Sequence, residues 1–163
     1  MKNEDLDVLK NKIIELSKEY FNKKNSINNE FIPNISSIPV SGKVLDQEDI
    51  TNLVESSLEA WLTAGEFTDS FEKSIREFLD IRHCLFVNSG SSANLLAISG
   101  LKILNNIPDG SEVITSSVNF PTTLNPILQN NLIPVLVDAE IGTYNINPDL
   151  IEEKISKKTV GIV

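Results

Sequence analysis

Residues 84–94 read CLFVNSGSSAN, and this stretch decides the fold class. A short apolar run, residues 84–87, leads directly into a segment rich in serine with one glycine. Glycine permits a sharp turn and serine is a strong helix N-cap, so the stretch predicts a strand that turns into a helix at Ser91. A strand that leads into a helix is the building unit of a parallel sheet.

The same alternation of apolar runs and helical stretches continues to the end of the chain. Further strands are expected at residues 112–115, 133–137 and 160–163, and helices at residues 91–104, 122–130 and 148–155. Single helices between strands indicate βαβ crossovers, so the sequence predicts an α/β fold with a helix-covered parallel sheet. The run at 160–163 has the composition of a buried strand, and we therefore expect the chain to be the N-terminal part of a larger doubly wound domain.

The residues before position 84 carry helical patterns instead. A helix with one apolar stripe is predicted from the spacing of Leu6, Leu9, Ile13, Leu16 and Tyr20. Residues 25–42 are expected to form an extended connector. Asp46 should cap a second helix whose apolar face runs to Trp61 and which stops at Gly65 in a left-handed conformation, and a third should begin near Asp69.

Composition excludes several classes of function. The chain has 163 residues and a formal net charge of -9, which argues against nucleic acid as a partner because phosphate neutralisation needs a basic face. A single cysteine, Cys84, and a single histidine, His83, exclude a disulfide framework and a multi-cysteine metal site within this chain. The sequence shows neither a membrane-spanning apolar run nor a signal peptide, so we expect a cytoplasmic protein.

The strongest chemical signal is the serine-rich turn itself. Gly90, Ser91 and Ser92 offer backbone N–H groups and hydroxyls at a helix N-terminus, where the helix dipole favours an anion. One interpretation is a phosphate site, and the alternative is an ordinary serine-capped helix. The segment is neither a dinucleotide fingerprint nor a P-loop, because it lacks their second glycine and their Gly-Lys-Ser/Thr ending.

A second signal follows the strand expected at 112–115. Ligands of open α/β sheets gather at the carboxyl ends of the strands, so the loop that contains Phe120 should border the same crevice as the serine-rich turn. Phe120 could stack on a heterocycle there, or belong to the core. Pro121 suits the first turn of a helix, whereas Pro126 removes a hydrogen bond, so this helix is expected to be kinked or to start late.

Taken together, the motifs resemble the N-terminal part of one enzyme family. They are GKV at 42–44, WLTAG at 61–65, FE at 71–72, NSGSSAN at 88–94, FPTT at 120–123, VD at 137–138 and TYNI at 143–146. The family is the DegT/StrS-type nucleotide-sugar aminotransferases and dehydratases, which are fold-type-I pyridoxal phosphate enzymes. Residues 38–43 (IPVSGK) and 120–126 (FPTTLNP) most resemble its CDP-4-keto-6-deoxyglucose 3-dehydratase branch, which serves lipopolysaccharide O-antigen synthesis.

The resemblance implies a fold and a site. The fold is an incomplete three-layer parallel or mixed sheet of the large domain at residues 41–163, preceded by an N-terminal helix and connector at 1–40. Cofactor-binding positions are Gly90, Ser91 and Ser92 for the phosphate and Phe120 for stacking on the pyridine ring. Substrate-pocket positions are Thr63, Gly65, Thr122 and Asn125. Asp138 matches a strand-end acid that is interpreted as structural.

The resemblance also implies what lies outside these residues. The carboxylate that pairs with the pyridine nitrogen and the Schiff-base lysine fall beyond residue 163, so no catalytic residue is assigned here. In the dehydratase branch a histidine replaces that lysine, pyridoxamine phosphate exchanges freely, and cysteines hold an iron–sulfur cluster. Neither His83 nor Cys84 matches those positions. Four lysines match no catalytic context and are expected to be solvated: Lys102, Lys154, Lys157 and Lys158.

Implied partners are a nucleotide-sugar substrate, a second subunit in a homodimer and, for a dehydratase, a reductase. Two alternatives stay open. One is a sugar aminotransferase of the same family, whose remaining part would contain the lysine. The other is a non-catalytic fragment of an interrupted gene, and in either case we expect no turnover by the isolated 163 residues.

Overall fold

The computed structural model describes residues 3–26, 31–38 and 40–163. The chain forms two compact units, Met1–Cys84 and Leu85–Val163, and each is described by itself. The described part of the connector expected at 25–42 contains neither helix nor strand after α1 ends, while residues 27–30 and 39 lie outside the described residues. The domain boundary expected at 40/41 stays a prediction.

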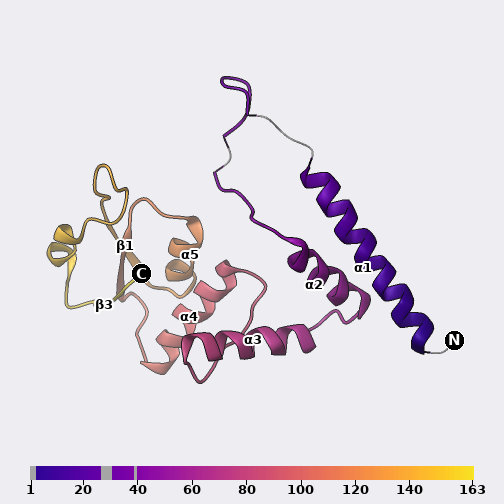
Figure 1. Cartoon of the computed structure of the whole chain (residues 1–163). Helices are drawn as coiled ribbons and strands as arrows, with labels where there is room; N and C mark the ends of the chain where they lie inside the picture. Colours follow the sequence, from indigo (N-terminus) through magenta and orange to yellow (C-terminus); the bar gives the residue numbers. More distant parts are fainter. Residues whose placement is uncertain (1–2, 27–30, 39) are drawn as a thin grey trace. The chain divides into compact units, whose positions relative to one another are not determined.

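The described residues of the first unit form three helices: α1 (Asn3–Asn25), α2 (Gln47–Leu58) and α3 (Glu66–Leu79) (Figure 1). α1 and α2 pack against each other. The helix predicted at the N-terminus is confirmed, but its buried side chain is Ile14, which lies outside the predicted stripe. Of the stripe, Leu16 and Tyr20 are 66% and 68% exposed, so this face is not packed within the described chain.

Asp46 caps α2 as predicted. Its carboxylate accepts hydrogen bonds from the backbone N–H groups of Glu48 (2.8 Å) and Asp49 (3.0 Å). The Asp49 carboxylate in turn accepts from the backbone N–H of Asp46 at 2.9 Å, which completes a capping box. Carboxylates therefore pair with the backbone N–H groups of Asp46, Glu48 and Asp49. The beginning of α2 is thus fixed by local sequence.

The predicted end of α2 is wrong. The helix stops at Leu58, and Ala60 adopts the left-handed conformation with φ of 49°. The backbone N–H of Ala60 donates to the Ser57 carbonyl at 3.2 Å and closes the helix there. Trp61 therefore lies beyond the end of the helix, where it is exposed. Gly65 is extended, with φ of -155°, and is the N-cap of α3. Because the backbone N–H of Asp69 donates to the Gly65 carbonyl at 3.0 Å, α3 begins at Glu66 and not near Asp69.

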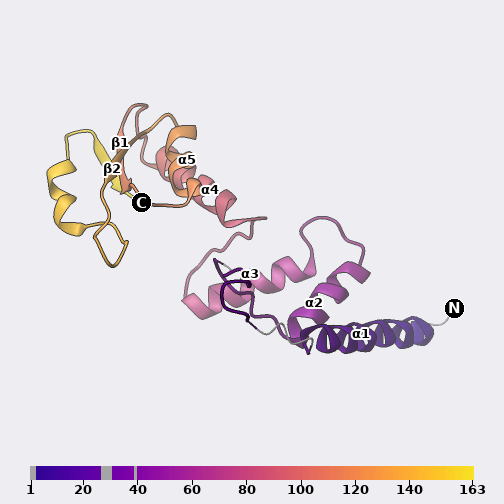
Figure 2. The same cartoon turned by 90° about the horizontal axis from the view of Figure 1, so that it is seen from above.

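The second unit is an α/β layer structure, as predicted (Figures 1 and 2). Its elements are α4 (Gly90–Leu104), β1 (Glu112–Ser116), α5 (Pro121–Gln129), β2 (Ile133–Val137), η1 (Pro148–Leu150), η2 (Glu152–Lys154) and β3 (Thr159–Ile162). Both β2 and β3 pair parallel with β1, in the order β2-β1-β3. In both views α4 and α5 lie on one side of the sheet, and η1 and η2 lie on the other.

The core of this unit lies between the helix pair and β1. Four buried side chains form it: Ile98 of α4, Val113 of β1, Ile127 of α5 and Leu132, which precedes β2. Ile127 is fully buried, as is Pro126 beside it. The core therefore fixes α4 and α5 on the sheet, and with them the two segments that carry the predicted cofactor residues.

Two predictions for residues 84–163 are corrected. Residues 84–87 belong to no strand of the described sheet, and no described strand pairs with them; Leu85 is 83% exposed. The helix expected at 148–155 is two single 3-10 turns, with i→i+3 bonds such as Ile151 N–H to Pro148 at 3.1 Å. The strand expected at 160–163 is present as β3. Within the described chain it pairs with β1 alone, its Ile162 is 55% exposed, and it bulges opposite Glu112 and Val113.

Lys102 is not a solvated lysine, and the expectation for it is wrong. Its ammonium donates to the Asp109 carboxylate and to the backbone carbonyl of Asn130, and its side chain is only 18% exposed. This contact ties the end of α4 to the end of α5, where a cation also interacts favourably with the helix dipole. Lys154, Lys157 and Lys158 are exposed, as expected.

A pH prediction follows from this contact. The Lys102 ammonium hydrogen-bonded to Asp109 lowers the pKa of that carboxyl below its usual value. A lowered pKa contributes stability that is present above the normal aspartate pKa of about 3.9 and is lost as the pH falls through the lower folded value. The melting temperature of the parent chain should therefore fall below about pH 4, and that of Asp109→Asn should fall less over the same pH range. Because Asp109 is 65% exposed, the effect should be small, and an unchanged acid dependence would contradict the contact.

Candidate cofactor-binding site

The beginning of α4 is organised by its own side chains. Ser89 is the N-cap, and its hydroxyl accepts from the backbone N–H of Ser92 at 3.2 Å. The Ser92 hydroxyl donates to the Asn88 side-chain carbonyl at 2.7 Å, and the backbone N–H of Ala93 donates to the Ser89 carbonyl at 3.1 Å. The helix therefore starts at Gly90, one residue earlier than predicted. The hydroxyl of Ser92 is already used within the turn.

Two backbone donors remain available at this helix end. Among the described residues, no hydrogen-bond acceptor pairs with the N–H groups of Gly90 and Ser91, and both residues are exposed. A Cβ built on Gly90 would meet nothing within 4 Å, so the approach to these amides is open. The first turn of α4 contains no acidic residue. Free N–H groups at the positive end of a 15-residue helix, without a competing carboxylate, fit a phosphate group.

Phe120 lies at the beginning of α5 and is 72% exposed, so it is not part of the core of the described unit. Pro121 occupies the first turn of α5, where its missing N–H costs nothing. The helix starts at Pro121 and not late, and it includes Pro126. The Phe120 side chain is thus exposed on a segment that is fixed by Pro121 and by the buried Pro126 and Ile127, and its stacking role stays a prediction.

The starts of α4 and α5 meet in the structure. The side-chain amide of Asn94, one turn into α4, donates to the backbone carbonyl of Thr122 at 3.2 Å. The loops after β1 and β2 also meet, because the backbone N–H of Ser117 donates to Val137 at 2.8 Å and its hydroxyl to Asp138 at 3.3 Å. The serine-rich turn, Phe120 and half-buried Thr122 therefore lie where the carboxyl ends of parallel strands gather ligands. Asn125 is exposed on α5.

Sequence reasoning did not single out Asn88 or Asn94. Asn88 accepts the Ser92 hydroxyl, and Asn94 links the two helices. Two features of the sequence point to Asn94. Its side chain carries two amide N–H donors among apolar helix residues, and Pro126, 32 positions later, leaves the Thr122 carbonyl without a helical donor. Neither signal indicates by itself that the two segments touch.

Thr63 and Gly65 belong to the first unit. Both line a cavity of about 300 Å³ together with Trp61 and Phe67. The indole N–H of Trp61 donates to the Ala64 carbonyl at 2.8 Å, and a Cβ built on Gly65 would lie 2.7 Å from Cδ1 of the ring. A side chain at position 65 would therefore meet the indole ring that lies against Gly65. The assignment of Thr63 and Gly65 to a substrate pocket stays a prediction.

Replacing Gly65 by alanine should displace the Trp61 ring. A Cβ at 2.7 Å from a ring carbon is too close, so we expect the exposed indole ring to shift and its hydrogen bond to Ala64 to weaken or break. Trp61 is the one tryptophan of the chain, so its emission spectrum reports the change directly. Gly42→Ala is the matched control, because a Cβ there meets nothing within 4 Å. Identical spectra for Gly65→Ala and Gly42→Ala would contradict this contact.

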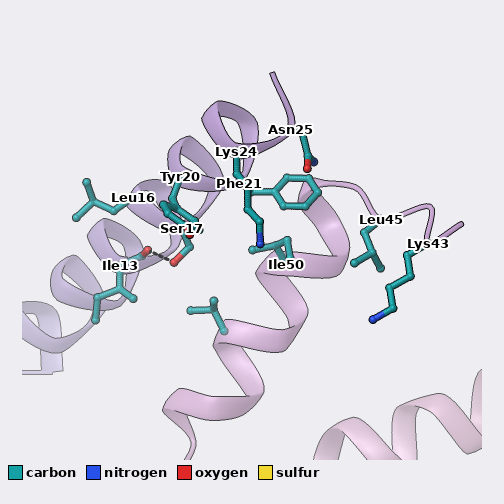
Figure 3. Close-up of a pocket in the computed structure, with 11 residues that line it drawn as sticks. Ile13, Leu16, Ser17, Tyr20, Phe21, Lys24, Asn25, Lys43, Leu45 and Ile50 are labelled. Atoms are coloured by element: carbon teal, nitrogen blue, oxygen red, sulfur yellow. Dashed lines mark hydrogen bonds between the residues drawn. The ribbon is translucent and has the colours of Figure 1, made fainter. Parts of the chain in front are cut away.

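A larger cavity lies elsewhere in the first unit. It measures about 680 Å³ between α1 and α2, with Leu16, Tyr20 and Val54 in its lining. Figure 3 shows Phe21 of α1 and Ile50 of α2 pointing into the space between the two helices. This groove contains none of the predicted site residues, and most of its lining is apolar.

No helix within the described stretches 3–26, 31–38 and 40–163 is long and apolar enough to cross a membrane. Those stretches also hold no cluster of three or more His, Cys, Asp or Glu side chains that could bind a metal ion.

The fold and the site define an α/β protein in which a helix with free N-terminal amides and an exposed aromatic residue meet beside a parallel sheet. The family model described as the DegT/DnrJ/EryC1/StrS aminotransferase family matches residues 44–163, and the chain belongs to this family.

Two curated relatives match nearly the whole chain. The lipopolysaccharide biosynthesis protein RfbH of Salmonella typhimurium is 44% identical over 95% of this chain and 36% of its own length. A dTDP-4-dehydro-2,6-dideoxy-D-glucose 3-dehydratase of Saccharopolyspora spinosa is 41% identical over 94% of this chain and 34% of its own. The chain thus spans about a third of the length of these relatives.

A solved structure confirms the fold class. A GDP-4-keto-6-deoxymannose-3-dehydratase, crystallised with a trapped PLP-glutamate geminal diamine, superimposes with a TM-score of 0.68 at 26% identity. The match covers 77% of this chain and 33% of that one. The fold predicted from the resemblance, that of the fold-type-I pyridoxal phosphate enzymes, is therefore confirmed, as is the family.

Proposed function

We propose that these residues are the cofactor-holding part of a pyridoxamine or pyridoxal phosphate-dependent nucleotide-sugar 3-dehydratase. The observation that carries the proposal is the pair of free N–H groups of Gly90 and Ser91 at the positive end of α4. They provide an anion site at the expected edge of the sheet. The 41% identity with a named 3-dehydratase over 94% of the chain supports the choice of reaction.

Each site residue has a role in this proposal. Gly90 and Ser91 bind the cofactor phosphate, Ser92 fixes the turn through Asn88 and adds its dipole, and Phe120 stacks on the pyridine ring. When bound, the cofactor would be attached to one carbon of the sugar and would supply an electron sink for cleavage of a bond at the neighbouring carbon. Thr63, Gly65, Thr122 and Asn125 are proposed to border the nucleotide-sugar pocket.

The proposal includes the organisation of the longer protein. Residues 41–163 form the beginning of its large domain, which agrees with a family match that starts at residue 44, and residues 1–40 precede it. The acid–base group of the reaction and, for a dehydratase, the iron–sulfur cluster belong to the remaining part. We propose a cytoplasmic homodimer that works with a reductase, and no turnover by the 163 residues alone.

A sugar aminotransferase is the second candidate, favoured by the description of the family model itself. The two candidates share the cofactor site described here and differ in the residue that faces the reacting carbon. A histidine at the Schiff-base position of the longer protein would support the dehydratase, and a lysine there would support the aminotransferase.

Titration with matched ligands tests the cofactor assignment. Pyridoxamine phosphate should bind the chain, and its fluorescence should fall as its ring stacks on Phe120. Pyridoxamine lacks the phosphate and should bind at least about tenfold more weakly, because a charge-assisted hydrogen bond is lost. Phe120→Leu should weaken binding about tenfold while phosphate selectivity is retained. Equal affinity for the two ligands would overturn the phosphate assignment.

A further inference from the structure

Pro126 leaves one carbonyl of α5 without its normal helical partner. In an α-helix the N–H of each residue donates to the carbonyl four residues earlier, and proline has no N–H. The carbonyl concerned is that of Thr122, in the first turn of α5. Pro126 is fully buried and Thr122 is half-buried, so water has limited access to this group. A buried carbonyl without a donor is costly.

Asn94 supplies the missing donor. Its side-chain N–H₂ donates to the Thr122 carbonyl at 3.2 Å, across 28 residues of sequence, and the bond is partly buried. Asn94 lies four residues after Gly90 in α4, which is about 6 Å along the helix axis. Thr122 lies two residues after Phe120. A single hydrogen bond thus connects the helix that presents free amides with the segment that presents the aromatic ring.

We propose that Asn94 is a positioning residue that holds the Phe120 segment at a fixed place relative to the phosphate-binding end of α4. Its role toward the cofactor rests on the proposed function. Phosphate and ring are joined by a short covalent link, so one ligand satisfies both anchors only if the two helices keep a fixed spacing. The core contact between Ile98 and Ile127 holds the helix bodies together, and the Asn94 bond holds their N-terminal ends.

A rescue experiment separates this role from general helix packing. Asn94→Leu keeps the size of the side chain and removes the donor, so the Thr122 carbonyl loses its partner. Pro126→Ala restores an N–H that can reach the same carbonyl along α5. In the Pro126→Ala protein the Asn94→Leu change should therefore have little effect. Four proteins are compared: the parent chain, the two single variants and the double variant.

Hydrogen exchange of the backbone amides of Thr123 and Asn125 is the first measurement. We expect exchange about tenfold faster in Asn94→Leu than in the parent chain, and a return to within about twofold in the double variant relative to Pro126→Ala. Unchanged exchange in Asn94→Leu, or an equal increase in the two backgrounds, would overturn the proposal. This readout needs no cofactor.

Ligand binding is the second measurement. Asn94→Leu should weaken pyridoxamine phosphate about tenfold, leave inorganic phosphate unaffected, and be rescued in the Pro126→Ala protein. Equal weakening of both ligands would overturn the positioning role, since it would mean damage to the phosphate end itself. A parent chain that binds neither ligand would instead contradict the proposed function, while the exchange data would still decide whether Asn94 holds the Phe120 segment.

Discussion

A glutamate in place of Ser91 should weaken the binding of pyridoxamine phosphate about a hundredfold without lowering the thermal stability of the protein. Ser91 is exposed in the first turn of α4, where a carboxylate is favourable to the helix dipole, so the helix should be as stable as before or more so. The same carboxylate occupies the anion site and repels the phosphate. Opposite effects on stability and on binding are the signature of an anion site, because a purely structural role would change both together.

The control is Ser74→Glu at an exposed position of α3. Like Ser91→Glu, it adds one negative charge to the net charge of -9. Its affinity for pyridoxamine phosphate should equal that of the parent chain, because Ser74 lies in α3 and is not one of the proposed cofactor-binding residues. Isothermal titration calorimetry and thermal melts give the two quantities. Equal affinities for Ser91→Glu and Ser74→Glu would contradict the anion site at α4.

Ile127→Ala should lower the free energy of unfolding by about 3 kcal/mol, the largest effect that we expect on stability. The side chain is fully buried among Ile98, Val113 and Leu132, and its removal leaves a cavity between the helix pair and β1. Leu128 is the adjacent residue of the same helix and is 51% exposed, so Leu128→Ala should cost less than about 1 kcal/mol. Urea denaturation that gives both variants the same midpoint would contradict the assigned core.

The parts of the fold that local sequence determines were predicted well. The Asp46 capping box, the beginning of α4 within one residue, and the strands at 112–116 and 133–137 follow from cap chemistry and from short apolar runs between turns. The alternation of apolar runs and helical stretches supplied the α/β class. The family resemblance supplied the particular fold and the cofactor, since composition and spacing alone left the serine-rich turn open between a phosphate site and an ordinary cap.

The parts that depend on distant contacts were not predicted. Residues 84–87 have a strand composition, but a strand also needs a neighbour, and local sequence does not say whether one is present. The left-handed residue after α2 is Ala60 and not Gly65, because the turn closes on Ser57 while Gly65 makes room for the Trp61 ring. The bond between Asn94 and Thr122 spans 28 residues and could be found only in the folded chain.

The central claim is that the N–H groups of Gly90 and Ser91 hold the cofactor phosphate. The most direct measurement is a titration of the ¹⁵N-labelled chain with pyridoxamine phosphate, followed by the amide resonances in two-dimensional NMR spectra. The amides of Gly90 and Ser91 should show the largest downfield shifts, with the same midpoint as the shifts at Phe120. Two results would contradict the account. One is saturation with pyridoxamine phosphate without a shift of the Gly90 and Ser91 amide resonances, and the other is that the largest shifts occur around Lys24 and Lys43 in the groove between α1 and α2.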